Sequence, residues 1–363
     1  MTQHFHNVQA LRGVACLLVV LGHLGIWDNA FVGGTPGVRE FGYVGFTGVD
    51  LFFVLSGFII TATNRRSLGR PNAVPGYLFR RLWRIYPTYW AALGLTAAAG
   101  WAAFGSKPFE AISDPELPGW LALTPLDRHN PIIGQAWTLT YEVMFYLAFG
   151  ALLCLPPRAA AAGLAAWGVG VAAALVAPVP THPWAALPVS PFVFEFLGGC
   201  AVAWLAGRGV RGWAGTALVA GLAWATAGAV LVAHGSENYG GAMSGHRLRV
   251  LVFGPAAVLI VYAVVSAEGR WPRRVPGWLL RTGDASYSLY LTHTATLVAA
   301  LFVGMKVPHT RLAHLIGLLT VLAAVLAVGF VFYALVERPL LNLVRRRPKP
   351  APAVVVVPMS RAA

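Results

Sequence analysis

Charged side chains are scarce in this sequence. Asp, Glu, Lys and Arg together make up 11% of its 363 residues, less than half of the roughly 25% that is usual in soluble domains. Hydrophobic residues reach 57%, and the mean hydropathy is +0.65. This composition excludes an ordinary water-soluble fold and is typical of a chain that crosses a membrane many times.

Cysteine and acidic residues are also few. Cys16, Cys154 and Cys200 lie inside apolar runs and lack the spacing of a metal site, so we predict neither a disulfide framework nor a bound metal. Only 13 Asp and Glu oppose 27 Lys and Arg, which gives a net charge of +14. In a membrane chain such an excess is first explained by cytoplasmic loops, so we expect no nucleic-acid partner. Walker, Rossmann and Gly-x-Ser-x-Gly signatures are absent.

Long apolar runs fill most of the chain. A bilayer core about 30 Å thick needs about 20 apolar residues per helix, and the alternating pattern of a membrane barrel is absent. We therefore predict an all-α polytopic membrane protein, a bundle of about ten transmembrane helices in a single domain over residues 1–342. Residues 343–363, basic and then rich in Pro and Ala, are expected to form a disordered cytoplasmic tail. The predicted spans are 8–27, 44–62, 85–105, 135–155, 160–178, 191–206, 213–233, 249–267, 284–304 and 313–335.

The distribution of Lys and Arg predicts the orientation of the bundle. Basic residues concentrate in cytoplasmic loops, and the loop after the second predicted span contains Arg65, Arg66, Arg70 and three further arginines. With that loop inside, 20 of the 27 Lys and Arg residues fall on the same side. Both termini are therefore expected in the cytoplasm, and the chain is expected to be a multi-pass protein of the inner (plasma) membrane, with the lipid bilayer as its first partner.

Arg12 and His23 lie eleven residues apart in the first predicted span. At about 100° and 1.5 Å per residue, this spacing places both side chains on one face of a helix, about 16 Å apart along its axis. An ionisable side chain inside a bilayer is costly, so each is a candidate functional residue. The alternative is that Arg12 extends to the membrane surface and that His23 hydrogen-bonds within the bundle.

Asp50 in the second span and Glu142 in the fourth are expected at about the membrane depth of His23. A histidine beside a carboxylate can act as a general base, because the carboxylate fixes its tautomer. We predict that His23 is catalytic, with Asp50 or Glu142 as its partner. Glu142 is favoured because its side chain is longer and because the hydroxyls of Thr138 and Tyr141 could hold it. A purely structural ion-pair network is the alternative.

Arg81 and Arg84 lie three residues apart where the third span begins. On a helix, this spacing lets two forked guanidinium groups point at one anion, and such groups suit phosphate. Anchoring to lipid headgroups is the alternative.

Six motifs, taken together, resemble the acyltransferase 3 family of integral-membrane acyltransferases. They follow the order of the family's signatures over about residues 5–342, which is nearly the whole chain. The first and fourth motifs are most similar to the branch that modifies exopolysaccharides. The motifs are residues 9–13 with His23, 48–58, 81–87, 137–142, 286–293 and 336–339.

The resemblance implies transfer of an acetyl or similar short acyl group from cytoplasmic acyl-CoA, with acetyl-CoA as the expected donor. The implied acceptor is a hydroxyl of an envelope or secreted glycan, or of a lipid-linked saccharide, supplied by a polysaccharide biosynthesis machinery. Arg12 and His23 match the family's essential first-helix pair. Arg81 and Arg84 match its CoA-contacting arginines, and Glu142 matches a recurrent acidic position. His23 would act as the general base or would carry the acyl group transiently, and the sequence leaves both routes open.

Two other classes of protein are compatible with polar residues in the membrane. A transporter or exporter of a small acid or glycan precursor could use Asp50, Glu142, Glu195 and His293 as its pathway. The paired broken helices of inverted repeats, which would favour a transporter, are absent from the sequence. A non-catalytic subunit of a polysaccharide assembly machine is the other alternative.

Reporter fusions test the predicted orientation. Fusions within 65–80, 207–212, 268–282 and 340–363 should report the cytoplasm, because the basic residues concentrate there. Fusions within 106–134 and 234–247 should report the opposite side. A cytoplasmic signal from a fusion near residue 240 would show that the spans after residue 158 were miscounted.

Overall fold

The computed structural model describes residues 5–32, 42, 44–104, 113–178, 180–234, 246–268, 275–304 and 311–345. Within these ranges all regular structure is helical, without a strand, so the all-α prediction is confirmed. Helix α17 extends to Arg345, just beyond the predicted end of the domain at residue 342. Residues 346–363, predicted to be disordered, lie outside the described residues.

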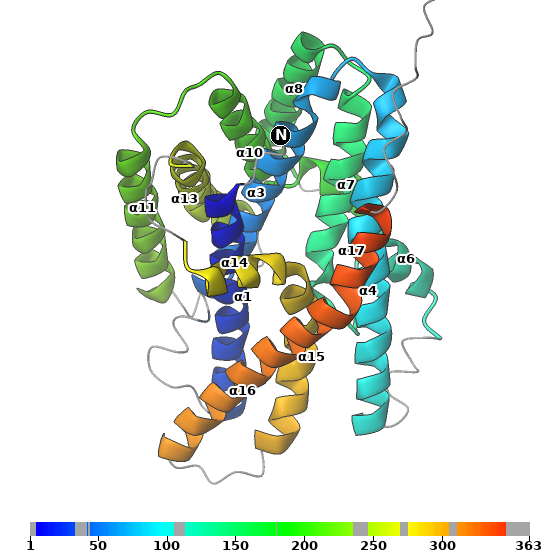
Figure 1. The fold of residues 1–363 in the computed structure, drawn as a ribbon, viewed down its shortest axis with the longest axis vertical. Helices are drawn as coiled ribbons and strands as arrows, with labels where there is room; N and C mark the ends of the chain where they lie inside the picture. Colours follow the sequence, from blue (N-terminus) through cyan, green and yellow to red (C-terminus); the bar gives the residue numbers. More distant parts are fainter. Residues whose placement is uncertain are drawn as a thin grey trace, which may run out of the picture.

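A long helix covers most or all of each of the ten predicted spans (Figure 1). These helices are α1 (His6–Val32), α3 (Thr47–Asn64), α4 (Val74–Phe104), α7 (Trp137–Leu152), α8 (Pro157–Val176), α10 (Val193–Gly207), α11 (Ala214–His234), α13 (His246–Ser266), α15 (Ser286–Gly304) and α16 (Arg311–Phe332). The short elements are η1 (Arg65–Ser67), η2 (Pro71–Ala73), α6 (Leu117–Ala122), η3 (Gly134–Ala136), α9 (Pro183–Ala186), η4 (Leu187–Val189), α14 (Gly277–Asp284), the π-helical η5 (Tyr333–Glu337) and α17 (Arg338–Arg345).

Seven helical segments of the described residues are long and apolar enough to cross a membrane. The remaining three predicted spans correspond to α4, α7 and α15, so the count of about ten crossings stays a prediction. Helix α4 begins at Val74 instead of residue 85, because its basic first turns continue the helix beyond the apolar run that hydropathy detects. The seven segments are His6–Ile26, Thr47–Ser67, Pro157–Val176, Pro183–Gly207, Ala214–Leu231, Leu248–Ser266 and Ala313–Val344.

Helices α1, α3 and α10 pack with their backbones almost in contact. A Cβ atom added at Gly48 of α3 would lie 2.2 Å from the carbonyl oxygen of Ala15 in α1. One added at Gly199 of α10 would lie 2.0 Å from the carbonyl oxygen of Val54. Small residues permit this approach, which is how helices associate where lipid offers no hydrophobic driving force.

The ends of several helices meet at one end of the bundle. The backbone N–H of Asn7 donates to Oε2 of Glu268 at 3.0 Å, and the side-chain amide of Gln9 donates to Oδ1 of Asp284 at 2.7 Å. These contacts fix the start of α1 against the segment between α13 and α15. That segment and the start of α1 belong to the side predicted to face the cytoplasm.

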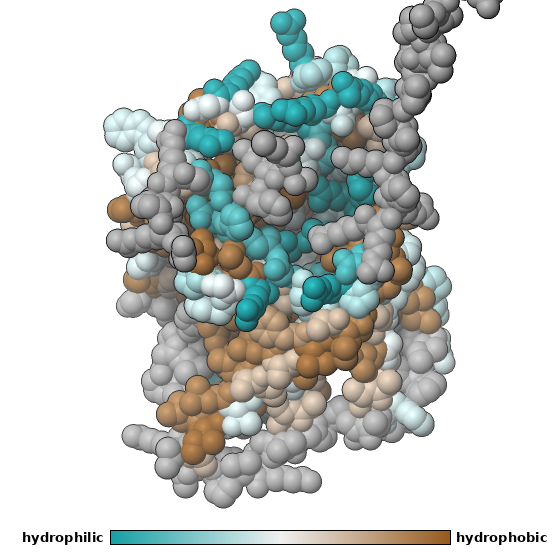
Figure 2. Space-filling view, in the orientation of Figure 1, coloured by the Kyte–Doolittle hydropathy of each residue, from teal (hydrophilic) through white to brown (hydrophobic). Residues whose placement is uncertain are grey.

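The surface divides into a hydrophilic and a hydrophobic part. Figure 2 shows hydrophilic side chains over α14 and the upper part of the molecule, and hydrophobic ones over α16 below. Leu315, Ile316 and Leu319 of α16 are large, apolar and more than half exposed. Such a surface is stable in lipid and would be a liability in water.

One connection turns back into the bundle. Helix α6 lies beside the middle of α4 (Figure 1). Tyr86, Tyr89 and Trp90 of α4 donate hydrogen bonds of 2.7 to 2.9 Å to backbone carbonyls of α6. Helix α7 then starts at the level of α6. Helix α4 therefore extends well beyond the start of α7.

Candidate active site

An open pocket with about 800 Å³ of empty space lies among α1, α3, α4, α7 and α15. Arg12, Arg81, Arg84 and Glu142 line it together, although they come from three different helices. The structure thus places four of the six predicted site residues around one space. His23 and Asp50 are not among the residues that line it.

Two of the arginines are held by hydroxyl groups. Nη2 of Arg12 donates to Oγ of Ser286 at 3.0 Å, and Nη2 of Arg81 donates to Oγ1 of Thr63 at 3.1 Å. The Arg81 guanidinium also lies 5.6 Å from the ring centre of Tyr146. Because a guanidinium has five N–H donors, these contacts orient the group and leave donors for a ligand. Three cations and one carboxylate make the pocket suited to an anionic ligand.

Glu142 is held from within its own helix and from α3. Its carboxylate accepts a short hydrogen bond from the hydroxyl of Tyr146 and another, at 3.4 Å, from Oγ of Ser56. The spacing of four residues places Tyr146 on the same face of α7 as Glu142. Thr138 and Tyr141 were expected to hold this carboxylate, but the hydroxyl of Thr138 instead pairs with Tyr290 at 2.7 Å.

The ring beside His23 belongs to His293. The two ring centres are 4.8 Å apart, and Nε2 of His293 lies 3.3 Å from Nδ1 of His23. Neither Asp50 nor Glu142 is a hydrogen-bond partner of His23 in this structure. The group next to the candidate base is therefore a second imidazole, contributed by α15 and fully buried.

Backbone carbonyls determine where the ring hydrogens lie. Nδ1 of His293 is 2.7 Å from the carbonyl oxygen of Tyr290, and Nδ1 of His23 is 3.0 Å from that of Val19. Because a carbonyl oxygen only accepts, each neutral ring carries its hydrogen on Nδ1. The single hydrogen on Nδ1 of His23 is then shared between the carbonyl oxygen of Val19 and Nε2 of His293. The lone pair of His23 is left on Nε2, the atom that a general base would use.

Asp50 lies in a buried ion pair. Its Oδ2 is 2.9 Å from Nη2 of Arg249 in α13, and both side chains are at most 8% exposed. The same Nη2 donates to the carbonyl oxygen of Phe46 at 2.7 Å, and the Phe46 ring meets the His23 ring edge-on at 5.1 Å. Arg249 and Phe46 therefore connect Asp50 with His23.

The sequence assigned no part in acyl transfer to two further buried residues, His293 and Glu337. His293 belongs to one recognised motif and Glu337 to another. Glu337 lies in the π-helical segment η5 and accepts hydrogen bonds from the backbone N–H of Ser288, at 3.1 Å, and from its hydroxyl. A π-helical turn shifts the register of a helix, and such turns are frequent at functional sites. Here the turn brings the Glu337 carboxylate to Ser288 at the start of α15. Ser288 lies two residues after Ser286, which binds Arg12.

Comparison with known proteins decides the family. The model of the acyltransferase 3 family, described as an acyltransferase domain, matches residues 5–336. The chain belongs to the acyltransferase 3 family. The resemblance predicted from the six motifs is thereby confirmed, and the chain is an O-acyltransferase of the multi-pass membrane type.

Two relatives cover most of the chain. The exopolysaccharide production protein ExoZ of Rhizobium meliloti (strain 1021) is 31% identical over 320 residues, which span 84% of this chain and 92% of ExoZ. The putative membrane-bound transacylase BcsY of Komagataeibacter xylinus is 28% identical over 361 residues, which span 94% of this chain and 84% of BcsY. No solved structure shows a significant match.

The buried ion pair generates a stability prediction. Asp50→Ala should lower the free energy of unfolding by about 3–5 kcal/mol, because it leaves the Arg249 cation buried without its partner. Changing both residues, Asp50→Leu with Arg249→Met, should recover most of this loss. Thermal unfolding of the detergent-solubilised protein measures both effects, with the exposed Asp127→Ala as a control expected within about 0.5 kcal/mol of wild type. Unfolding of Asp50→Ala at the wild-type temperature would contradict this role of the pair.

Proposed function

We propose that this chain, placed in the inner (plasma) membrane, transfers a short acyl group such as acetyl from cytoplasmic acyl-CoA to a hydroxyl of an envelope or secreted glycan. The observation that carries the proposal is the pocket lined by Arg12, Arg81, Arg84 and Glu142, close to the histidine pair. The name of ExoZ, an exopolysaccharide production protein, supports a glycan acceptor.

The donor fits the charge and shape of this pocket. Acyl-CoA carries phosphate groups at one end and its thioester at the end of a long, thin arm. Arg81 and Arg84 would bind the phosphates, because guanidinium groups form paired hydrogen bonds with phosphate oxygens. Phe52, Phe53 and Ile85 also line the pocket and offer an apolar wall for the arm.

The pocket leads toward the histidine pair through Tyr290. This residue lines the pocket, and its ring centre lies 5.8 Å from that of His293. His293 in turn contacts His23. An arm that enters beside Arg81 and passes Arg12 would bring its thioester to this end of the pocket.

In the proposed reaction, Nε2 of His23 removes the proton of the acceptor hydroxyl while the hydroxyl oxygen attacks the thioester carbonyl carbon. A carbon–oxygen bond forms, the carbon–sulfur bond breaks, and the imidazolium returns the proton to the leaving thiolate. His293 acts as a positioning residue, because its Nε2 shares the Nδ1 hydrogen of His23 with the carbonyl oxygen of Val19 and so helps to fix the tautomer. Asp50 positions the Phe46 wall through Arg249, and Glu142 faces the donor beside the arginines. A route through an acyl group on Nε2 of His23 uses the same lone pair.

Replacing the base tests the catalytic assignment. His23→Ala should lower the rate of transfer of labelled acetyl from acetyl-CoA to cell-surface glycan by about 10²- to 10⁴-fold, since a general base contributes that much. The variant should keep its melting temperature. His6→Ala, at the exposed start of the same helix, is the matched control and should transfer at the wild-type rate. Wild-type turnover by folded His23→Ala would exclude His23 as the base.

Replacing the arginines tests the donor site. Arg81→Ala with Arg84→Ala should raise the KM for acyl-CoA at least about tenfold with a smaller change in kcat, because contacts far from the thioester bind ground and transition states alike. Lysine in place of alanine at position 81 (Arg81→Lys) should recover only part of the lost affinity for acyl-CoA, since an ammonium group cannot form the paired hydrogen bonds of a guanidinium. Arg80→Ala is the matched control, because Arg80 is exposed and does not line the pocket. An unchanged KM in the double variant would show that these arginines only anchor the protein in the membrane.

A further inference from the structure

A second open pocket, with about 990 Å³ of empty space, lies on the other face of α7. Thr138 and Glu142 of this helix face the first pocket, whereas Thr140 and Tyr141 face the second. At about 100° per residue, the two sets point to opposite sides of the helix. The second pocket is closed on its far side by residues of α4, α6, α9 and η4.

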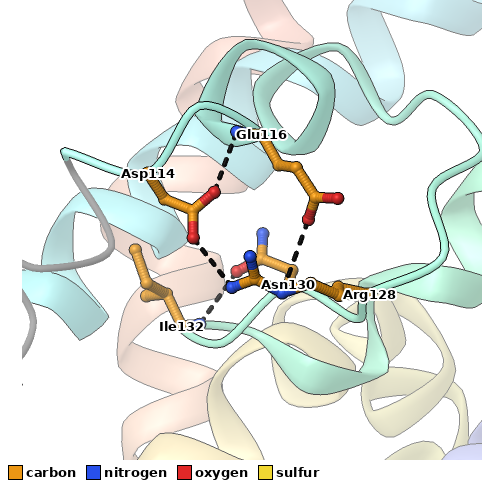
Figure 3. A network of polar contacts seen from close by, with 5 residues as sticks. All are labelled: Asp114, Glu116, Arg128, Asn130 and Ile132. Carbon is orange, nitrogen blue, oxygen red and sulfur yellow. Dashed lines mark hydrogen bonds and ion pairs between the residues drawn. The ribbon is translucent and has the colours of Figure 1, made fainter.

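A polar network fixes the irregular segment that forms one wall of this pocket (Figure 3). Asp114 accepts hydrogen bonds from the backbone N–H of Glu116 at 2.9 Å and from Nη2 of Arg128 at 2.7 Å. Both contacts lower the pKa of Asp114, the backbone hydrogen bond being the larger cause. Asn130 accepts from the backbone N–H of Ile132 at 2.9 Å. These hydrogen bonds fix the shape of the wall.

If α4 crosses the membrane as predicted, the position of this segment implies that water reaches the pocket. Helix α6 packs against the middle of α4, and the side chain of Arg128 in the same segment is 60% exposed. Irregular backbone within the depth of a membrane is tolerated only where it is buried in protein or lines a water-filled space. A polar ligand from the aqueous side can therefore enter here.

The lining combines aromatic faces with hydrogen-bonding groups. Trp120, Trp137 and Tyr141 contribute rings, while Asp127 and Thr140 contribute polar atoms. A sugar ring has the matching chemistry, because its C–H face is apolar and its rim carries hydroxyls that donate and accept. The indole N–H of Trp120 is buried and has no hydrogen-bond partner among the described residues.

The charge of this pocket differs from that of the first. Its one arginine, Arg128, is paired with Asp114 and lies 3.7 Å from Glu116, and Asp127 adds a negative charge. Apart from His129, the described lining residues include no cation without an acidic partner that would attract a phosphate or another anion. An uncharged saccharide fits better than a nucleotide or a lipid headgroup.

The pocket lies close to the histidine pair. Ala136 of η3 lines it, and the neighbouring Gln135 donates from Nε2 to the carbonyl oxygen of Tyr290 at 3.0 Å. The same carbonyl binds Nδ1 of His293. One short turn therefore separates the wall of the second pocket from the residue that fixes His23.

We propose that this second pocket binds an uncharged saccharide segment of the acceptor glycan, from which the reacting hydroxyl reaches the histidine pair past η3. This inference rests on the proposed function and adds the acceptor site to it. The donor and acceptor then occupy opposite faces of α7, so neither ligand has to leave before the other binds.

Direct binding tests this proposal. Oligosaccharides released from the producing cell's own surface polysaccharides, and freed of ester groups with mild base, are titrated into the full-length protein in detergent without acyl-CoA. Calorimetry gives the Kd. Asp127→Asn and Thr140→Val, both nearly isosteric, should each raise this Kd about tenfold through the loss of one or two hydrogen bonds. Trp184→Ala, on an exposed residue of α9 outside the pocket lining, should leave it unchanged.

The donor measured on the same samples separates the two proposals. Wild-type protein that binds acetyl-CoA but no oligosaccharide would overturn the acceptor site and leave the proposed function standing. Protein that binds oligosaccharide with a Kd insensitive to Asp127→Asn and Thr140→Val would also overturn it, because the glycan would then bind elsewhere. Oligosaccharide binding without acetyl-CoA binding would support the acceptor site and count against the proposed function.

Discussion

A charge that enters a bilayer has to find a partner there, and much of this structure depends on that constraint. The unpaired ion would cost several kcal/mol, so Asp50 and Arg249 fix α3 and α13 relative to each other. Arg249 also donates a hydrogen bond to the carbonyl oxygen of Phe46, whose ring packs against His23. The ion pair therefore helps to fix the position of the ring beside His23. Arg12 and Glu337 follow the same rule through Ser286 and Ser288, which tie α1 and η5 to the start of α15.

Helix α15 is the meeting point of these contacts. Its first turn holds Arg12 and Glu337, its second turn supplies Tyr290 to the arginine-lined pocket, and His293 follows about one turn later. Gln135 clamps the same stretch from the segment before α7. One rigid helix therefore sets the geometry of the pocket, of the histidine pair and of the edge of the second pocket, which is the precision that a reacting constellation requires.

The sequence predicts the helices well, because a long apolar run in lipid has to satisfy its own backbone and so has to be helical. It also predicts six site residues, and the structure gathers four of them, Arg12, Arg81, Arg84 and Glu142, around one pocket. The neighbour of His23 could not be found in this way, since His293 is 270 residues away and the rotation of α15 depends on packing. The packing of α6 alongside α4 could not be predicted either. The side chains of α4 donate to backbone carbonyls of α6, and such contacts require no particular residue types in α6.

The proposed reaction requires the donor to lie in the arginine-lined pocket with its acyl end at His23. Electron cryomicroscopy of the protein with a non-hydrolysable acetyl-CoA analogue, in which a methylene replaces the thioester sulfur, tests it most directly. Density for the phosphates beside Arg81 and Arg84, and for the acetyl carbonyl within contact distance of Nε2 of His23, is the predicted result. Phosphate density in the second pocket, or an acyl end directed away from His23, would contradict it.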